Sequence, residues 1–187
     1  RSMASKTDVI NRALSKLGQP RIANAETTNT KPARVMNGMW GSVRDAMLQA
    51  YPWKFAGYRT QLAATTAPEW GWDNAFLLPN DYLAMRQIKD DPDYDIENGK
   101  ILTDAGAPLY IRYTRRITNT AQFHPLFVEA FASRLAYEGC EEITDSNTKQ
   151  EKALRDLNLA INQAYQVDAI EVPSEELPED EWLEARI

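Results

Sequence analysis

The chain has 187 residues, one cysteine, one histidine and a net charge of −6 at pH 7. This length suits one sizeable domain, or one domain with an appendage, and no apolar run approaches the roughly 20 residues that cross a bilayer. An acidic balance argues against a surface that coats nucleic acid, since such binding depends on clustered lysine and arginine. A single cysteine excludes an internal disulfide, and one cysteine and one histidine are too few for a zinc site.

The first predicted helix covers residues 5–18. Ser5 and Asp8 match a capping box, and the apolar residues that follow recur on one helical face. Gly18, followed closely by a proline, ends the helix. Residues 1–4 are interpreted as a tag remnant with an N-terminal extension, because an arginine and a serine precede the first methionine.

A second helix is predicted over residues 30–51, with Thr30 as its N-cap. Beyond it the helical period disappears. Short apolar runs separated by turn residues predict a small antiparallel β lobe over residues 55–116. The clearest local signal is Asn98-Gly99, the preferred pair for a two-residue hairpin turn because both positions tolerate a positive φ.

Two more helices are predicted, over residues 125–143 and 148–170. Apolar residues cover most of the circumference of the first, so it should occupy the centre of the helical part. The second begins with a capping box at Thr148 and Glu151, and its apolar seam has the spacing of an antiparallel bundle. The seam consists of Leu154, Leu157, Ile161 and Ala164.

The order of these elements predicts an α+β fold, because the strands are separated from the helices along the chain. We expect the four helices to form an antiparallel bundle, with the small β lobe inserted between the two helix pairs. Residues 5–170 then make a single domain, and residues 171–187 follow as an extended acidic C-terminal arm.

The C-terminal arm carries the whole net charge of the chain. Of the 27 acids and 21 bases, seven acids and one base lie in residues 171–187, so the remainder is formally neutral. Such a segment buries too little apolar surface to order alone. It is either a solvated acidic terminus or an arm that orders against a partner, and its large apolar residues favour the partner. The residues predicted to dock are Trp182, Leu183, Ile187, Glu179 and Asp180.

A strand is predicted over residues 109–114, where the side chains of Leu109, Ile111 and Tyr113 point to one face. A small basic cluster lies at its end. We interpret it as a site of contact with an acidic partner, such as a neighbouring subunit, and the alternative is a solvated sheet face. The cluster consists of Arg112, Arg115 and Arg116. Aromatic residues close together before it favour packing in a core or an interface, because base stacking would need interleaved basic residues. These aromatic residues are Trp53, Phe55, Trp70 and Trp72.

Groups that could catalyse a reaction are sparse. His124 and Cys140 are separated by roughly 24 Å along the third predicted helix, so they cannot form a nucleophile–base pair. The acidic run at 90–95 lacks the spacing of a calcium loop, and no glycine-rich phosphate loop occurs. We therefore predict a protein that is not an enzyme and holds no cofactor or metal. A hydrolase using Glu138 and Glu142 is the weakest alternative, since no nucleophile supports it.

Several segments, in a fixed order and spread over most of the chain, resemble the tail tubular protein A family. This family comprises the head-to-tail adaptors of short-tailed phages and related prophages. The segments are ALSKLGQP at 13–20, YPWKFA at 51–56, WGW at 70–72 followed by FLLPNDYL at 76–83, NGKILT at 98–103, and FHPLFVEA at 123–130.

This resemblance implies a structural part of the virion neck, made in the host cytoplasm. Such adaptors form a ring, commonly of twelve copies, beneath the portal protein and connect it to the tail nozzle protein. DNA passes through the lumen without sequence-specific binding. The alternatives are another neck protein (a head-completion or tail-terminator protein), or an intracellular helical interaction domain whose acidic tail regulates a partner.

Overall fold

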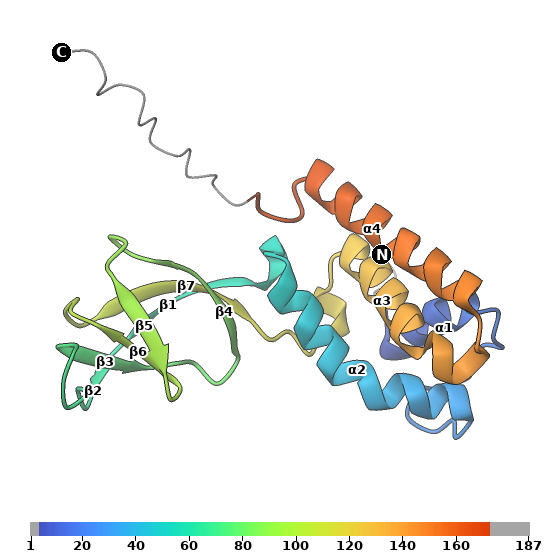
Figure 1. Cartoon of the computed structure of the whole chain (residues 1–187), viewed down its shortest axis with the longest axis horizontal. Coiled ribbons are helices and arrows are strands. Elements are labelled where there is room, and N and C mark those ends of the chain that lie inside the picture. Colours follow the sequence, from blue (N-terminus) through green and yellow to red (C-terminus); the bar gives the residue numbers. More distant parts are fainter. Residues whose placement is uncertain (1–3, 173–187) are drawn as a thin grey trace, which may run out of the picture.

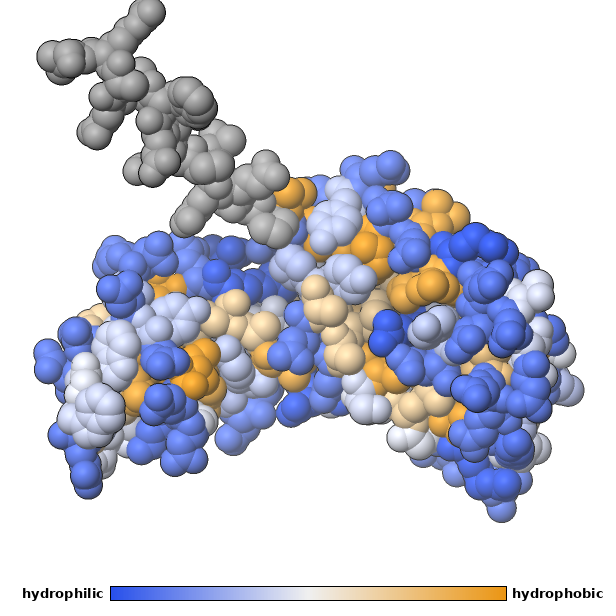
Figure 2. All heavy atoms as spheres, in the orientation of Figure 1, coloured by the Kyte–Doolittle hydropathy of each residue, from blue (hydrophilic) through white to orange (hydrophobic). Residues whose placement is uncertain are grey.

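The computed structural model describes residues 4–172, which form an elongated molecule with helices at one end and strands at the other (Figure 1). Within this range there are four α-helices and seven strands in two antiparallel sheets. Two lobes are visible in Figure 2, with a hollow between them along the lower edge of that view. Apolar residues show in small patches on both lobes, separated by hydrophilic surface.

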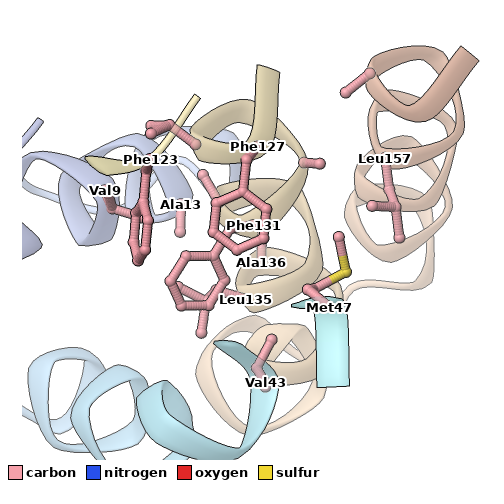
Figure 3. Packing of buried hydrophobic residues seen from close by; sticks show 14 of the residues in the cluster. Val9, Ala13, Val43, Met47, Phe123, Phe127, Phe131, Leu135, Ala136 and Leu157 are labelled. Atoms are coloured by element: carbon pink, nitrogen blue, oxygen red, sulfur yellow. The ribbon is translucent and has the colours of Figure 1, made fainter. Parts of the chain in front are cut away.

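The helical part is built around one central helix. The four helices are α1 (Lys6–Lys16), α2 (Lys31–Ala50), α3 (Pro125–Thr144) and α4 (Asn147–Gln166). Figure 3 shows Phe127 and Phe131 of α3 among side chains from all three of the other helices. Both rings are fully buried. The central position predicted for this helix from its apolar circumference is confirmed.

The predicted four-helix antiparallel bundle with a small inserted β lobe is wrong. In a bundle each helix packs on two neighbours, but α4 packs extensively only on α3, and α1 and α2 barely touch each other. The reason is that apolar residues cover almost the whole circumference of α3, so each of the other three helices can pack on it separately. The strands, moreover, form two sheets with a core of their own rather than a minor appendage.

The buried face of α4 matches the predicted seam in part. Three residues of the predicted seam, Leu157, Ile161 and Ala164, are buried as expected, but Leu154 is 38% exposed and the buried face also includes Ala153 and Ala160. Small side chains at these positions let the two backbones approach closely, and a search for large apolar residues overlooks them. The helix begins earlier than predicted because the Ser146 hydroxyl, rather than Thr148, accepts the capping hydrogen bond. It ends at Gln166 rather than at residue 170.

The strands divide between a three-stranded and a four-stranded sheet. In the first sheet the order is β1 (Gly57–Leu62), β7 (Leu109–Arg115), β4 (Tyr82–Ile88). In the second it is β2 (Ala64–Thr65), β3 (Asn74–Leu77), β6 (Lys100–Thr103), β5 (Tyr94–Glu97). Two short 3₁₀ turns, η1 (Lys54–Ala56) and η2 (Thr120–Gln122), link strands and helices.

The two sheets enclose a small second core. Its buried members are Phe76, Ile88, Ile101, Leu109, Ile111 and Tyr113. The alternation predicted for the last strand is confirmed, since Leu109, Ile111 and Tyr113 all point into this core. The predicted hairpin is also confirmed: both residues of the Asn98-Gly99 turn have positive φ, and the flanking strands pair with Glu97 opposite Lys100.

Candidate partner-binding surfaces

The three arginines predicted to form one basic cluster are not brought together. Side chains alternate along a strand, so Arg112 and Arg115 of β7 point to opposite faces of the three-stranded sheet. The Arg115 guanidinium lies 4.9 Å from the centre of the Tyr58 ring. Arg116 donates a hydrogen bond of 2.7 Å from Nε to the Asp45 carboxylate of α2. These residues thus make contacts within their own chain.

Arg112 belongs to a buried junction between the helices and the sheet. Its Nη1 donates to the Glu171 carboxylate at 2.7 Å, and the Nη1 of Arg86 lies 3.4 Å from the same oxygen. The Arg86 side chain is only 5% exposed. It donates from Nη2 to the carbonyl of Trp53 at 2.6 Å and from Nε to the Thr114 hydroxyl at 2.9 Å. One guanidinium therefore joins the end of α2, two strands and the C-terminal region.

The last described residues are fastened to this junction by their backbone. The amide of Glu171 donates to the Pro52 carbonyl, and the amide of Lys54 donates to the Ala169 carbonyl. Ile170 and Trp53 also pair as an isolated antiparallel bridge. The predicted arm, which was set to begin at residue 171, therefore starts from a fixed point beside Arg112 and Arg86.

Next to the junction, the polar face of the three-stranded sheet forms a pocket of about 520 Å³. Three strands contribute to it in register: Arg59 of β1 lies opposite Arg112 of β7, which in turn lies opposite Gln87 of β4. The complete lining is Arg59, Thr60, Gln61, Gln87, Lys89, Asp90, Tyr110, Ile111 and Arg112. We call this hollow the basic pocket.

The basic pocket has a positive charge that its own lining does not neutralise. Arg59 and Lys89 are both exposed, and among residues 4–172 neither has a carboxylate within 4.0 Å. Lys89 Nζ lies 5.2 Å from the centre of the Tyr110 ring, a cation–π arrangement. Asp90 is the acid of the lining. Such a surface is suited to binding carboxylates or phosphates.

The predicted aromatic group is divided between the helical core, which holds Trp53 and Phe55, and the loop between β2 and β3, where Trp72 is partly buried and Trp70 is exposed. Trp53 is fully buried and donates from its indole nitrogen to the Met47 carbonyl. Trp70, in contrast, is 87% exposed on the loop between β2 and β3, and Leu77 of β3 is 61% exposed. Gly71 has a φ of 91°, a conformation that glycine adopts without strain. The loop thus presents an indole to solvent at the strand end of the molecule.

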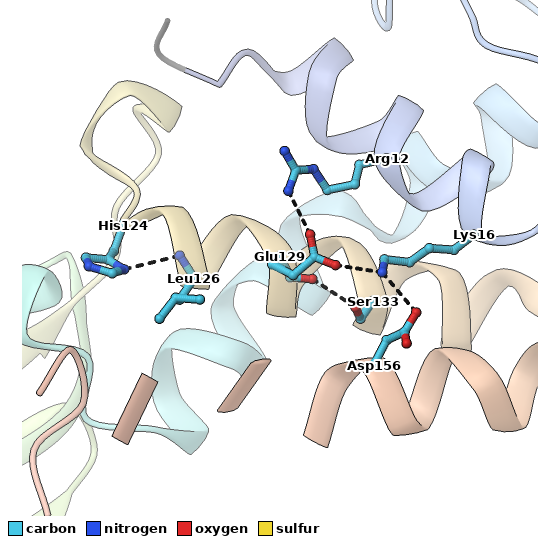
Figure 4. A network of polar contacts seen from close by, with 7 residues as sticks. All are labelled: Arg12, Lys16, His124, Leu126, Glu129, Ser133 and Asp156. Carbon is cyan, nitrogen blue, oxygen red and sulfur yellow. Dashed lines mark hydrogen bonds and ion pairs between the residues drawn. The ribbon is translucent and has the colours of Figure 1, made fainter. Parts of the chain in front are cut away.

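A polar network in the helical part ties three helices together (Figure 4). The Glu129 carboxylate of α3 accepts from Arg12 at 2.7 Å and pairs with Lys16 at 2.6 Å, both on α1. Lys16 also reaches Asp156 of α4 at 3.0 Å. Burial alone would lower the pKa of Lys16 and raise that of Glu129. Their mutual hydrogen bonds, with those to Asp156 and Arg12, outweigh burial, so the pKa of Lys16 is raised and that of Glu129 lowered.

The residues considered for catalysis have structural contacts and do not converge. His124 caps α3, its Nδ1 accepting from the amide of Leu126 (Figure 4). Cys140 is fully buried, as expected for a small apolar residue. Glu138 pairs with Arg134 one turn away on the same helix, and Glu142 lies at the surface beside α2.

Among residues 4–172, no three histidine, cysteine, aspartate or glutamate side chains gather into a group that could hold a metal ion. None of the helices in that range has the length and apolarity to span a membrane. The predicted docking residues Trp182, Leu183, Ile187, Glu179 and Asp180 lie outside the described part of the chain.

Sequence reasoning missed Arg86, Arg59 and Lys89. Arg86 leaves one signal in the sequence, a charge inside the strand-like run Leu83–Ile88. The basic pocket leaves almost none, because its two exposed cations, Arg59 of β1 and Lys89 just after β4, lie far apart in the chain. No protein-family model matches this chain, and no curated protein matches it either.

Proposed function

We propose that this chain is a head-to-tail connector of a short-tailed phage or prophage, without enzymatic activity. Copies of it assemble as a ring beneath the portal protein, join it to the tail nozzle protein, and leave a conduit for DNA. The order and spacing of the segments that resemble tail tubular protein A support this role. The structural observation that carries it is the exposed indole of Trp70.

Trp70 has the properties of an interface anchor. A tryptophan side chain buries about 150–250 Å². At roughly 25 cal/mol per Å², covering the exposed 87% of it is worth roughly 3–5 kcal/mol. Exposed Leu77 lies on the strand that follows the Trp70 loop. Tryptophans in such positions dominate the energetics of many interfaces, so we assign this end of the molecule to contacts with a neighbouring subunit.

The shape and charge of the chain suit a ring around DNA. Subunits in a ring contact each other head to tail through two different surfaces, and the helical and strand ends offer surfaces of different character. Sliding DNA requires a lumen that neutralises few phosphates, because every phosphate contact strengthens binding through counterion release. A chain that is formally neutral before residue 171 meets this requirement.

Sedimentation with portal rings tests this function. We expect the wild-type chain to co-sediment with portal rings as a ring of copies, and Trp70→Ser to lose most of this binding. Trp70→Phe keeps an aromatic ring and should retain much of it. An unchanged circular dichroism spectrum for both variants would show that the fold is intact. Wild-type chain that stays monomeric beside portal rings would contradict the proposal and favour an interaction domain or another neck protein.

A further inference from the structure

Two cations of the basic pocket have no acidic partner in the described part of the chain. Arg59 of β1 and Lys89, just after β4, are exposed, and no carboxylate of residues 4–172 lies within 4.0 Å of either. They come from the two outer strands of the three-stranded sheet. The Lys89 ammonium lies 5.2 Å from the centre of the Tyr110 ring, on the middle strand, so it reaches inward across the pocket.

The junction beside the pocket adds positive charge. Arg112 is not a free cation, because its guanidinium pairs with Glu171. The same carboxylate also lies 3.4 Å from Arg86, so two guanidiniums share one acid. With Asp90 of the lining included, the pocket and the junction together hold four cations and two acids. The surface around the two unpaired cations therefore attracts an acidic partner.

The turn between α3 and α4 carries the opposite charge. Glu141 and Asp145 are exposed, lie one helical turn apart, and share a hollow of about 270 Å³ whose lining contains no base. Among residues 4–172, no lysine or arginine lies within 4.0 Å of either carboxylate. The ammonium of Lys149, close by in the sequence, donates instead to the Leu17 carbonyl at 2.8 Å. We call Glu141 and Asp145 the acidic turn.

We propose that the acidic turn of one copy binds in the basic pocket of the next copy in the ring. Glu141 and Asp145 of one chain pair with the two unpaired cations of its neighbour, one carboxylate to each cation. This inference rests on the proposed connector function and specifies one contact that joins adjacent subunits.

The placement of the two surfaces suits a head-to-tail contact. The basic pocket lies on the strand part of the molecule, whereas Figure 1 shows the α3–α4 turn on the side of the helical part away from the sheets. Two different surfaces on opposite parts of a chain propagate from copy to copy, and they close into a ring when the rotation allows it. A contact between two identical surfaces would bring like charges together, which costs several kcal/mol.

The spacing of the charges fits as well. Neighbouring strands lie about 4.8 Å apart, so the outer strands that supply the two cations are separated by roughly 10 Å. Lys89 already reaches the middle strand, which shortens the gap between the charged groups. Residues one turn apart on a helix have Cβ atoms about 5–6 Å apart, and the Asp145 amide bonds to the Glu141 carbonyl in that manner. Two carboxylates at this spacing can therefore meet both cations at once.

A nucleic acid fits the pocket less well. Its binding depends on several phosphate contacts, whereas the pocket offers two unpaired cations beside Asp90. It would also have to approach a chain of net charge −6. A pair of carboxylates on a second copy needs only the two cations that are present.

Carbodiimide coupling tests the contact, because it joins a lysine amine to a carboxylate that lies against it. A mixture of isotope-labelled and unlabelled chains distinguishes coupling between copies from coupling within one copy. In rings bound to the portal, we expect mass spectrometry to find Lys89 of one copy joined to Glu141 or Asp145 of another. Lys89 joined only to its own chain or to the portal would overturn the inference.

The same experiment separates this contact from the connector function. Rings in which Lys89 couples to neither residue of the acidic turn would overturn the contact and leave the connector function intact. The expected cross-link in a chain that does not bind portal rings would support the contact and contradict the connector function.

Reversing the charges gives a second measurement. Arg59→Glu/Lys89→Glu should form rings at least about tenfold less well than the wild-type chain, because like charges then face each other. Glu141→Arg/Asp145→Asn should be impaired in the same way. Asparagine is chosen at position 145 because it tolerates the positive φ of 51° found there.

A chain that carries all four substitutions should form rings again, since the attraction is restored with its direction reversed. The matched control, Lys152→Glu/Arg155→Glu, reverses two exposed cations of α4 that line neither hollow, and it should assemble like the wild-type chain. Circular dichroism checks that each variant is folded. Folded single-surface variants that still form rings, or a loss that the combined variant does not recover, would overturn the contact.

Discussion

Replacing Arg86 with methionine should loosen the connection between the helical part and the sheets. Methionine has a similar length but cannot donate hydrogen bonds. The variant loses the bond to the Trp53 carbonyl at 2.6 Å and the bond to the Thr114 hydroxyl at 2.9 Å. It also removes the cation that lies 3.4 Å from the Glu171 carboxylate.

The cost follows from how buried these partners are. Hydrogen bonds to a charged group contribute about 1.5–3 kcal/mol each, and breaking a fully buried ion pair costs about 3–5 kcal/mol. Glu171 keeps its pair with Arg112 and is 27% exposed, so the ion-pair contribution is reduced. Burial of the Arg86 guanidinium costs desolvation energy, which also lowers its pKa. The methionine variant avoids this desolvation cost, so the net loss of stability is smaller than the sum of the lost contacts. We expect the free energy of unfolding to fall by about 2–4 kcal/mol.

Urea denaturation followed by circular dichroism and by tryptophan fluorescence measures this change. The matched control is Arg155→Met, which removes an exposed arginine of α4 and should change the free energy by less than about 0.5 kcal/mol. Because the junction couples two cores, the two probes should no longer coincide in Arg86→Met. A loss below about 1 kcal/mol, with coincident transitions, would refute the importance of this contact.

Two further predictions concern the helical part. Glu129→Gln should lower the free energy of unfolding by about 1–2 kcal/mol at pH 7, because half-buried Lys16 loses one of its two carboxylate partners and keeps only Asp156. The folded pKa of Glu129 lies below 4.5. Its contribution is therefore present above pH 4.5 and disappears as the pH falls through the folded pKa. Urea titrations from pH 7 to 3 should show the two proteins converging, and a constant difference would contradict this. Ala160→Leu should lower the free energy of unfolding by about 1–3 kcal/mol, because the larger side chain overpacks the α3–α4 contact. The control Leu159→Ala changes an exposed residue and should lower it by less than about 0.5 kcal/mol. Equal shifts in the melting temperatures of the two variants would contradict the assignment of this contact face.

Features set by neighbouring residues could be predicted from the sequence. The capping box of Ser5 and Asp8 and the Thr30 cap are present as expected. The Asn98-Gly99 turn forms as well. In each case a few adjacent residues satisfy their own backbone groups, so the signal lies within one short segment.

Features that depend on distant partners could not be predicted. An apolar pattern gives the presence of α4 and most of its buried face, but it includes exposed Leu154 and overlooks Ala153 and Ala160, because alanine packs closely without appearing strongly apolar. In the same way, three arginines within five residues of the sequence suggest one cluster, although strand alternation and separate partners divide them. The basic pocket depends on the register of three strands, which no single segment encodes.

The connector role is tested most directly by electron microscopy of the chain mixed with its portal protein. We expect a closed ring of this chain seated beneath the portal, with the Trp70 loop covered by the adjacent subunit. Portal rings with no added density, or isolated copies bound without contacting each other, would contradict the account.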